Sequence, residues 1–211
     1  MTSPILTSLG DKASVTTGKG LQRAEEILMA ARDILVAEGY AGLTLRGIAM
    51  RVNVSLSNVQ HYYKGLDALM EALLVYLMDG YQRQIEALIK SMSDSTQRER
   101  LLAVMDLLLS EGRKTEVCGV FVEAWALGQR LPFAAQVMEQ IQEREGKEFY
   151  KLMYGLNPEI SAKECKHRAA LSVMLIHGLM VQIPHDGTSA LSRKHMEDAI
   201  RQQILHWATV P

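Results

Sequence analysis

Apolar residues recur three and four positions apart along most of this chain, which is the spacing of one face of an α-helix. The stretch from Ala24 to Leu35 shows the pattern, and Gly39 stands where such a helix would end. A longer stretch from Leu66 to Leu88 follows the same period. We see no strand pattern and no internal repeat. The sequence therefore predicts an all-α fold.

Glycine, proline and capping residues divide this pattern into about nine helices. Two short helices are expected to start after the caps Thr44 and Ser55, the second running to Tyr62, and Ser161 with Glu164 is expected to form a capping box. The other predicted helices span about 20–38, 66–90, 97–111, 115–128, 132–154, 161–183 and 190–208, with breaks such as Pro184, Asp186 and Gly187 between them.

The composition is that of a globular protein, with 48% hydrophobic and 22% charged residues. Because no apolar run approaches the ~18 residues of a membrane span, and no signal-peptide stretch is seen, we expect a soluble protein of the cytoplasm with no membrane partner. Residues 1–18, rich in Ser, Thr and Gly, are expected to form a flexible arm.

Cys118 and Cys165 are the two cysteines, and neither has the spacing of a metal site. We expect buried reduced thiols, with a redox switch as the alternative, and neither a metal nor a cofactor. An enzyme would have to use Cys118 as its nucleophile, with Glu123 and His177 as distant partners, and no phosphate loop or other catalytic motif supports that reading.

The charge is unevenly distributed along the chain. Residues 1–64 contain seven Lys and Arg against five Asp and Glu, whereas residues 65–211 contain 16 against 19. A site for nucleic acid is therefore expected toward the N-terminus.

Residues 44–62 have the pattern of a helix-turn-helix: a first helix with the small Ala49 on its inner face, a turn at Val52–Val54, and a second helix after Ser55. The middle residue of such a turn adopts a left-handed conformation, which Asn tolerates better than other non-glycine residues, so Asn53 fits. Val54 and Val59 would pack the second helix against the domain.

The opposite face would then be free to read a major groove, Asn and Gln pairing with adenine edges and cations holding phosphates. The alternative is a solvated surface helix without a ligand. The predicted DNA-binding residues are Thr44, Arg46, Ser55, Leu56, Ser57, Asn58, Gln60, His61, Tyr62 and Lys64.

Residues 27–74 resemble the DNA-binding domain of the tetracycline-repressor (TetR) family. The resemblance lies in Ala30-Ala31-Arg32, Glu38-Gly39-Tyr40, Thr44-Leu45-Arg46, Asn53-Val54-Ser55, His61-Tyr62-Tyr63 and Asp67-Ala68-Leu69. Gln60, Asn53 and Leu66 depart from the Tyr, Gly and Lys that are common in the family, and His177-Gly178-Leu179 stands where Asp-Gly-Leu is usual. Lys64 is in a position to compensate for Leu66.

The resemblance implies a helix-turn-helix domain at 19–64 and a helical ligand-binding and dimerisation domain at 65–211. It implies a transcriptional regulator, most often a repressor, that binds a palindromic DNA operator as a homodimer and is released by a small-molecule effector. The alternative is an all-helical ligand-binding or adaptor protein that has lost specific DNA binding.

The implied effector cavity would lie among the middle helices, and the last two helices would form a four-helix bundle with a partner. The residues predicted to line the cavity are Met78, Met105, Phe121, Trp125, Met153, Met174 and His177. Those predicted at the dimer interface are Val173, Gly178, Val181, Ile200, Ile204 and Trp207. For the methionines, ordinary core packing is the alternative, and for His177 it is a hydrogen-bonded buried histidine. For the last two helices, the alternative is that they complete the core of a monomer.

Overall fold

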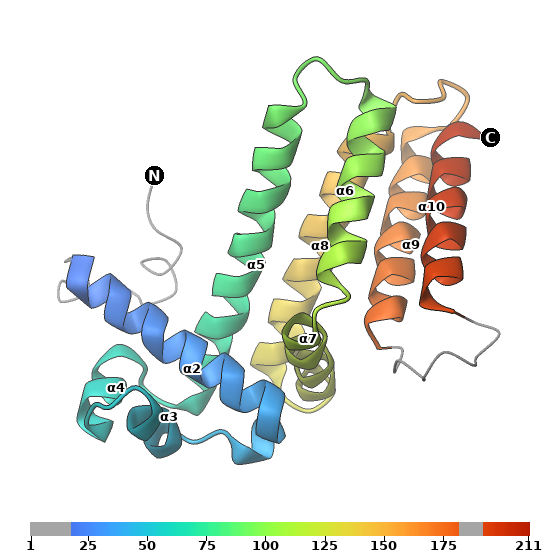
Figure 1. Cartoon of the computed structure of the whole chain (residues 1–211). Helices are drawn as coiled ribbons and strands as arrows, with labels where there is room; N and C mark the ends of the chain where they lie inside the picture. Colours follow the sequence, from blue (N-terminus) through green and yellow to red (C-terminus); the bar gives the residue numbers. More distant parts are fainter. Residues whose placement is uncertain (1–17, 182–191) are drawn as a thin grey trace. The chain divides into compact units, whose positions relative to one another are not determined.

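The structure is a computed structural model that describes residues 18–181 and 192–211 (Figure 1). In these ranges it contains nine α-helices and no strand, so the predicted all-α fold is confirmed. The helices are α2 (Gly18–Gly42), α3 (Leu45–Arg51), α4 (Leu56–Tyr62), α5 (Leu66–Ser91), α6 (Gln97–Glu111), α7 (Thr115–Gly128), α8 (Pro132–Met153), α9 (Ala162–Met180) and α10 (Arg193–Thr209).

Two sequence-based expectations fall on other parts of the chain. The arm at residues 1–18 lies outside the described residues apart from Gly18, which begins α2. The break at Pro184, Asp186 and Gly187 lies outside them as well, as do the last two residues of the helix predicted for 161–183. Among the described residues no helix has both the length and the apolarity that crossing a bilayer would require.

The chain contacts divide the molecule into two compact units. Unit 1 comprises the chain up to Gln82 together with residues 119–138, and unit 2 comprises residues 83–118 and the chain from Glu139 onward. The divisions fall inside α5, α7 and α8. A domain boundary between residues 64 and 65 stays a prediction.

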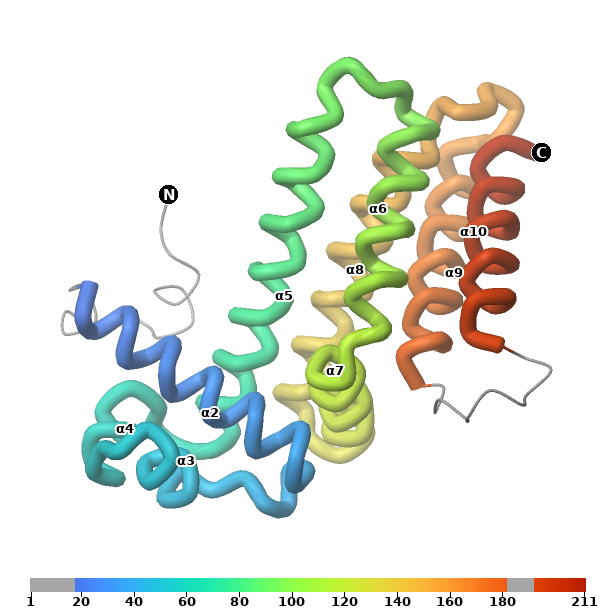
Figure 2. The backbone as a smooth tube through the Cα atoms, viewed as in Figure 1, coloured from blue at the N-terminus to red at the C-terminus, as the bar shows by residue number. Residues whose placement is uncertain are grey.

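Unit 1 is built around α2, which packs against α3, while α3 packs against α4 (Figure 2). The apolar face of α2 is buried, as its spacing predicts, and Ile48 and Val59 of the two short helices are fully buried as well. The Tyr63 hydroxyl donates a hydrogen bond to the carbonyl oxygen of Ala24 at 3.2 Å. This bond ties the end of α4 to α2, and burial raises the pKa of Tyr63.

The regular course of α2 breaks at Gly39, which has φ 70° and ψ 179°. The positive φ belongs to the left-handed half of backbone space, where glycine is the favoured residue. Gly39 was predicted to end this helix, and the chain does turn there, although a last helical turn reaches Gly42.

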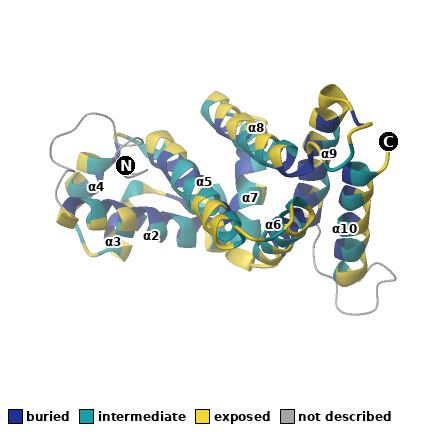
Figure 3. Ribbon diagram, turned by 90° about the horizontal axis from the view of Figure 1, so that it is seen from above, coloured by how far each residue is buried: buried dark blue, intermediate teal, exposed yellow. Residues whose placement is uncertain are grey.

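Unit 2 has its own apolar core, contributed by the end of α5 and by α6, α8, α9 and α10. Phe149, Leu101 and Ile204 are among its fully buried side chains. Helices α9 and α10 lie side by side (Figure 1). The long helices carry buried residues on one side and exposed residues on the other (Figure 3), which is the outcome expected for amphipathic helices.

An ionic cluster fixes the start of α10 within unit 2. The fully buried Glu197 carboxylate accepts hydrogen bonds from both Arg113 and Arg193. Arg193 also donates to the carbonyl oxygens of Leu179 and Gly112, which end α9 and α6. The bond from Arg113, and to a lesser degree those from Arg193, hold the pKa of Glu197 below its usual range against the opposing effect of burial.

Helix caps agree with the sequence in part. The Thr44 and Ser55 caps are confirmed, because their side chains accept hydrogen bonds from the amides of Gly47 and Asn58. Of the capping box predicted at Ser161 the structure shows the Ser161 bond, while the Glu164 carboxylate accepts from Arg168 at 2.7 Å. A complete capping box, which the sequence analysis missed, joins Thr96 and Glu99 at the start of α6.

Candidate nucleic-acid interface and ligand site

The turn between α3 and α4 has the geometry of a helix-turn-helix. Asn53 has φ 52° and is the only non-glycine residue with a positive φ among the residues that the structure describes. The amide of Val54 donates back to the carbonyl oxygen of Ala49 at 3.0 Å, which closes the turn. The prediction that Asn53 takes the left-handed position is confirmed.

Helix α4 offers a polar surface on the side opposite to its buried residue Val59. Ser57, Gln60 and His61 are exposed there, and Leu56, Asn58 and Tyr62 are half-buried. Thr44, Arg46, Ser55 and Lys64, in or beside the two short helices, are exposed too. None of the ten predicted DNA-binding residues is buried, so this surface is open to a ligand.

The two side-chain amides of this surface, those of Asn58 and Gln60, differ in their exposure. The side-chain oxygen Oδ1 of Asn58 is buried without a hydrogen-bond partner. A bidentate contact with adenine uses both the oxygen and the nitrogen of an amide, so Asn58 would have to turn its side chain to make one. Gln60 is exposed and meets that requirement as it stands.

The sequence analysis missed one residue of this surface. Met50 of α3 has 76% of its surface exposed, four positions after Arg46 and therefore on the same side of the helix. A methionine with that exposure is uncommon. Its spacing of four residues from Arg46 could have predicted that Met50 belongs to the same surface. Met50 therefore places an exposed apolar side chain beside the cationic Arg46.

Known proteins similar to this chain in sequence include HTH-type transcriptional regulators. No protein-family model matches the sequence. An uncharacterized HTH-type transcriptional regulator of Xanthobacter autotrophicus is 37% identical over 113 residues, which are 51% of this chain and 54% of that protein. The chain thus matches about half the length of this curated relative.

Solved structures match over most of the chain. A TetR transcription regulator from Haloarcula marismortui aligns with a TM-score of 0.71 at 21% identity, covering 89% of this chain and 97% of the other. The chain has the TetR-family fold. A protein from Saccharomonospora viridis, crystallised in complex with choline, aligns with a TM-score of 0.73 at 18% identity over 88% of this chain and 97% of its own.

The ligand residues predicted for this TetR-fold chain fall in both units. In unit 1, Met78 is buried, and the rings of Phe121 and Trp125 meet edge to face on α7 with centroids 6.0 Å apart. The indole nitrogen of Trp125 is buried and has no hydrogen-bond partner. A buried donor without a partner is costly, and such groups often mark the place of a ligand or water.

In unit 2, Met105 and Met153 belong to the apolar core. His177 of α9 is buried, with its Nε2 2.7 Å from Oε2 of Glu145 on α8. Met174 of α9 is 42% exposed in the single chain. The role of all seven residues in binding an effector stays a prediction.

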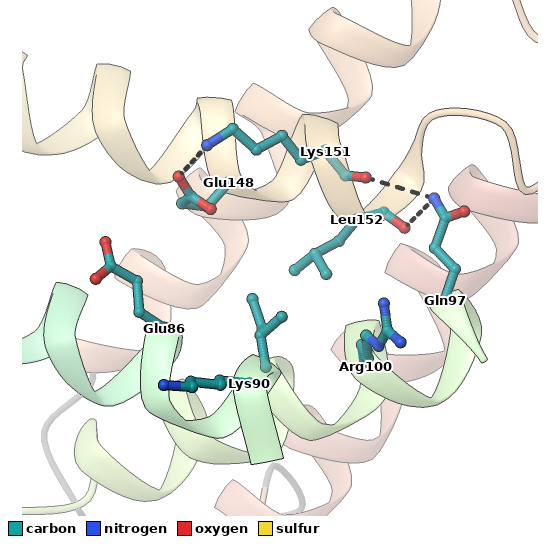
Figure 4. A pocket seen from close by; sticks show the side chains of 8 residues that line it. Glu86, Lys90, Gln97, Arg100, Glu148, Lys151 and Leu152 are labelled. Carbon is teal, nitrogen blue, oxygen red and sulfur yellow. Dashed lines mark hydrogen bonds and ion pairs between the residues drawn. The ribbon is translucent and has the colours of Figure 1, made fainter. Parts of the chain in front are cut away.

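Unit 2 also has an open pocket of about 520 Å³, lined by residues of α5, α6 and α8 (Figure 4). None of the seven predicted ligand residues lines it. Several of its polar groups have partners: Lys151 pairs with Glu148 at 2.6 Å, and the Gln97 amide donates to the carbonyl oxygens of Lys151 and Leu152. The Gln97 bonds cap the end of α8.

The residues predicted at the dimer interface divide into two groups. Val173, Ile200 and Ile204 are buried in the core of their own chain, so their side chains have little surface to offer a partner. Trp207 packs partly against the same core. Gly178 and Val181 are exposed.

Helix α9 exposes a further apolar set that the sequence analysis did not assign to an interface. Leu171 and Met174, like Val181, are large apolar residues with substantial exposure. Together with Gly178 they follow a spacing of three and four residues, so they form one stripe along α9 and its C-cap residue Val181.

The two cysteines are free thiols. Burial raises the pKa of each, and the Cys118 thiol donates to the carbonyl oxygen of Gly112 at 3.0 Å. A nucleophilic or redox-sensing cysteine needs a lowered pKa, so neither environment favours that chemistry.

Proposed function

We propose that this protein is a ligand-responsive DNA-binding transcriptional regulator, acting as a repressor in the cytoplasm. It would bind a palindromic operator as a homodimer and leave it when a small-molecule effector binds. The observation that carries the proposal is the helix-turn-helix, in which the Asn53 turn and the Ser55 cap present an open polar face of α4.

The chemistry of this face suits base recognition better than general attraction to DNA. Gln60 and Ser57 are exposed donors and acceptors, which can read base edges. Arg46 and Lys64 lie at the margins, where cations contact phosphates. The HTH-type regulator that is 37% identical to part of this chain supports the same reading.

The stripe Leu171, Met174, Gly178 and Val181 supports a dimer. A monomer with such a stripe on one helix would leave it in water, whereas a twofold partner would bury two copies of it against each other. In such a dimer Met174, which is also one of the predicted effector residues, would contribute to the interface. Two subunits would present two copies of α4, and half-sites one DNA turn apart call for a separation of about 34–36 Å.

The unpartnered indole N–H of Trp125 supports a ligand in unit 1. An effector that accepts a hydrogen bond would satisfy it, and Phe121 would supply apolar contact beside it. The choline complex of the Saccharomonospora viridis protein shows that a chain with this fold can hold a small organic molecule.

Genomic capture tests the proposal. The purified chain would be mixed with sheared DNA from its source genome at two salt concentrations, and the bound fragments sequenced. Gln60→Ala would serve as the test variant, and Gln140→Ala, an exposed glutamine of α8, as the control.

We expect enrichment of one palindrome that survives the higher salt with the parent and with Gln140→Ala, and that weakens or changes with Gln60→Ala. Diffuse recovery that disappears at the higher salt would contradict specific reading. The genes beside an enriched palindrome would indicate the class of effector.

A further inference from the structure

Helix α7 makes a polar contact with the end of α2, just before the helix-turn-helix, inside unit 1. The amide of Tyr40, directly after the break in α2, donates to Oε2 of Glu123 at 3.2 Å. The other oxygen of the same carboxylate lies against Gly39, where a Cβ atom would come within 3.2 Å of it. The carboxylate therefore sits across the break.

A second contact, one turn earlier, brings the two helices close together. A Cβ atom on Gly119 would lie 3.2 Å from both methyl carbons of Val36. Glycine at this position lets α7 approach the last regular turn of α2. Because residues 119 and 123 are four apart, Gly119 and Glu123 share one face of α7.

The residue that Glu123 contacts leads directly into the helix-turn-helix. The carbonyl oxygen of Tyr40 accepts from the amide of Leu43 at 3.1 Å, and Thr44 then caps α3. The Tyr40 hydroxyl donates to Asp67 at 3.2 Å, in the first turn of α5. Tyr40 is thus held by α7 through its backbone and by α5 through its side chain.

The opposite face of α7 carries Phe121 and Trp125. These residues are two positions from Gly119 and Glu123, which places them about 200° around the helix. The unpartnered N–H of Trp125 lies on this face. One helix therefore connects a place for a ligand with the entry to the DNA-binding helices.

We propose that Glu123 is the positioning residue through which α7 sets the start of α3, and so the DNA affinity of the protein. The inference rests on the proposed function, because it assumes that α3 and α4 bind DNA. A ligand that shifts α7 from its Trp125 face would alter the contact with Tyr40 and, through it, the DNA-binding helices.

The test compares three variants of the full chain. Glu123→Ala removes the acceptor, Glu123→Gln keeps an acceptor oxygen in place, and Glu116→Ala removes an exposed glutamate from the same helix as the matched control. Three quantities would be measured: amide hydrogen exchange over residues 40–48, the melting temperature, and affinity for the operator recovered by genomic capture.

We expect Glu123→Ala to speed exchange at Tyr40 and in the first turn of α3, and to weaken operator binding about fivefold per subunit, the effect of one hydrogen bond. Glu123→Gln and Glu116→Ala should keep exchange and affinity within about twofold of the parent. Faster exchange with unchanged operator affinity would overturn the proposal, since Glu123 would then be only a structural cap. Unchanged exchange in Glu123→Ala would overturn it as well.

The two proposals fail in different ways. If the parent chain itself selects no DNA sequence, the proposed function fails, and exchange in α3 still decides whether Glu123 positions that helix. If the parent selects an operator and Glu123→Ala binds it equally well, only the role of Glu123 is lost.

Discussion

Asn53 holds the turn between α3 and α4 with φ 52°, and the direction of α4 depends on it. Glycine adopts this conformation freely but also gains entropy in the unfolded chain, so we expect Asn53→Gly to change the free energy of unfolding by less than about 1 kcal/mol. A β-branched residue is strained there, and Asn53→Val should cost about 1–2 kcal/mol. Urea denaturation of both variants measures this, and an Asn53→Val variant as stable as the parent would contradict it.

Arg46 and Gln60 should affect DNA binding in different ways. In the proposed interface Arg46 would contact phosphate, so Arg46→Ala should weaken binding to all sequences alike and reduce the salt-dependence slope by about one per subunit. Gln60→Ala should instead relax the preference at one base position, at a cost of about 1–3 kcal/mol for the preferred base. Binding titrations over a salt series, with the operator and with single-base variants, distinguish the two. Equal loss at every base for Gln60→Ala would show that it does not read sequence.

Residue-level chemistry was largely predictable where it is local. Thr44, Ser55 and Asn53 interact with neighbours within a few positions, and their roles follow from residue type and spacing. The side-chain oxygen Oδ1 of Asn58 is different, because its burial depends on how α4 packs against its neighbours. Glu164 also has two possible partners within one turn, and the structure places it with Arg168.

At the scale of elements, Glu197 attaches α10 to the ends of α6 and α9. Glu197→Gln would leave Arg113 and Arg193 without a counter-charge, and we expect a loss of about 2 kcal/mol in the free energy of unfolding, discounted because Arg113 is more than half exposed. Ser110→Ala, an exposed change near the end of α6, is the control. Denaturation with guanidinium would be avoided in favour of urea, which does not screen the ion pairs.

The same cluster has a pH dependence whose sign follows from the lowered pKa of Glu197. A carboxylate with a lowered pKa in the folded state stabilises it above the unfolded pKa, near 4.5, and the contribution fades as pH falls through the folded pKa. The stability difference between the parent and Glu197→Gln should be constant from about pH 6 to 8 and shrink below the unfolded pKa. A difference that grows on acidification would contradict this assignment.

The stripe on α9 makes a prediction about assembly. Replacing Leu171 and Met174 by lysine places like charges opposite each other in a twofold interface, so the double variant should sediment as a monomer at concentrations where the parent is a dimer. Gln140→Lys, which adds a charge on α8, should leave the dimer intact. Sedimentation velocity measures the difference, and a double variant that remains dimeric would move the interface elsewhere.

Helix spans were predictable and helix partners were not. The limits of α6 and α7 agree with the glycine and capping signals beside them, and the other helices begin and end within a few residues of expectation. The contacts of Glu197 with Arg113 and of Glu123 with Tyr40 join positions more than 80 residues apart. Hydrophobic periodicity predicts which face of a helix is buried, but not which distant residue it contacts. For this reason the sequence did not show that Val173, Ile200 and Ile204 face the core of their own chain.

At the scale of the whole molecule, the excess positive charge and the unpartnered donor of Trp125 both belong to unit 1. The stretch with excess positive charge, residues 1–64, is the one that contains the helix-turn-helix. Trp125, whose indole N–H has no hydrogen-bond partner, belongs to the same compact unit. If the effector binds one conformation of this unit more tightly and DNA binds the other, each ligand lowers the affinity for the other by the same factor. A modest difference in effector affinity between the two conformations is therefore enough to release DNA.

The central claim is that two copies of this chain read one palindrome through α4. The most direct measurement is a titration of the captured operator, of a single half-site and of a scrambled duplex with the protein, with the stoichiometry read by sedimentation. We predict two chains on the operator and an affinity at least ~100-fold above that for the scrambled duplex, with the half-site far weaker than the whole. Equal affinity for all three duplexes would contradict the account and would favour an all-helical binding protein that has lost sequence-specific DNA recognition.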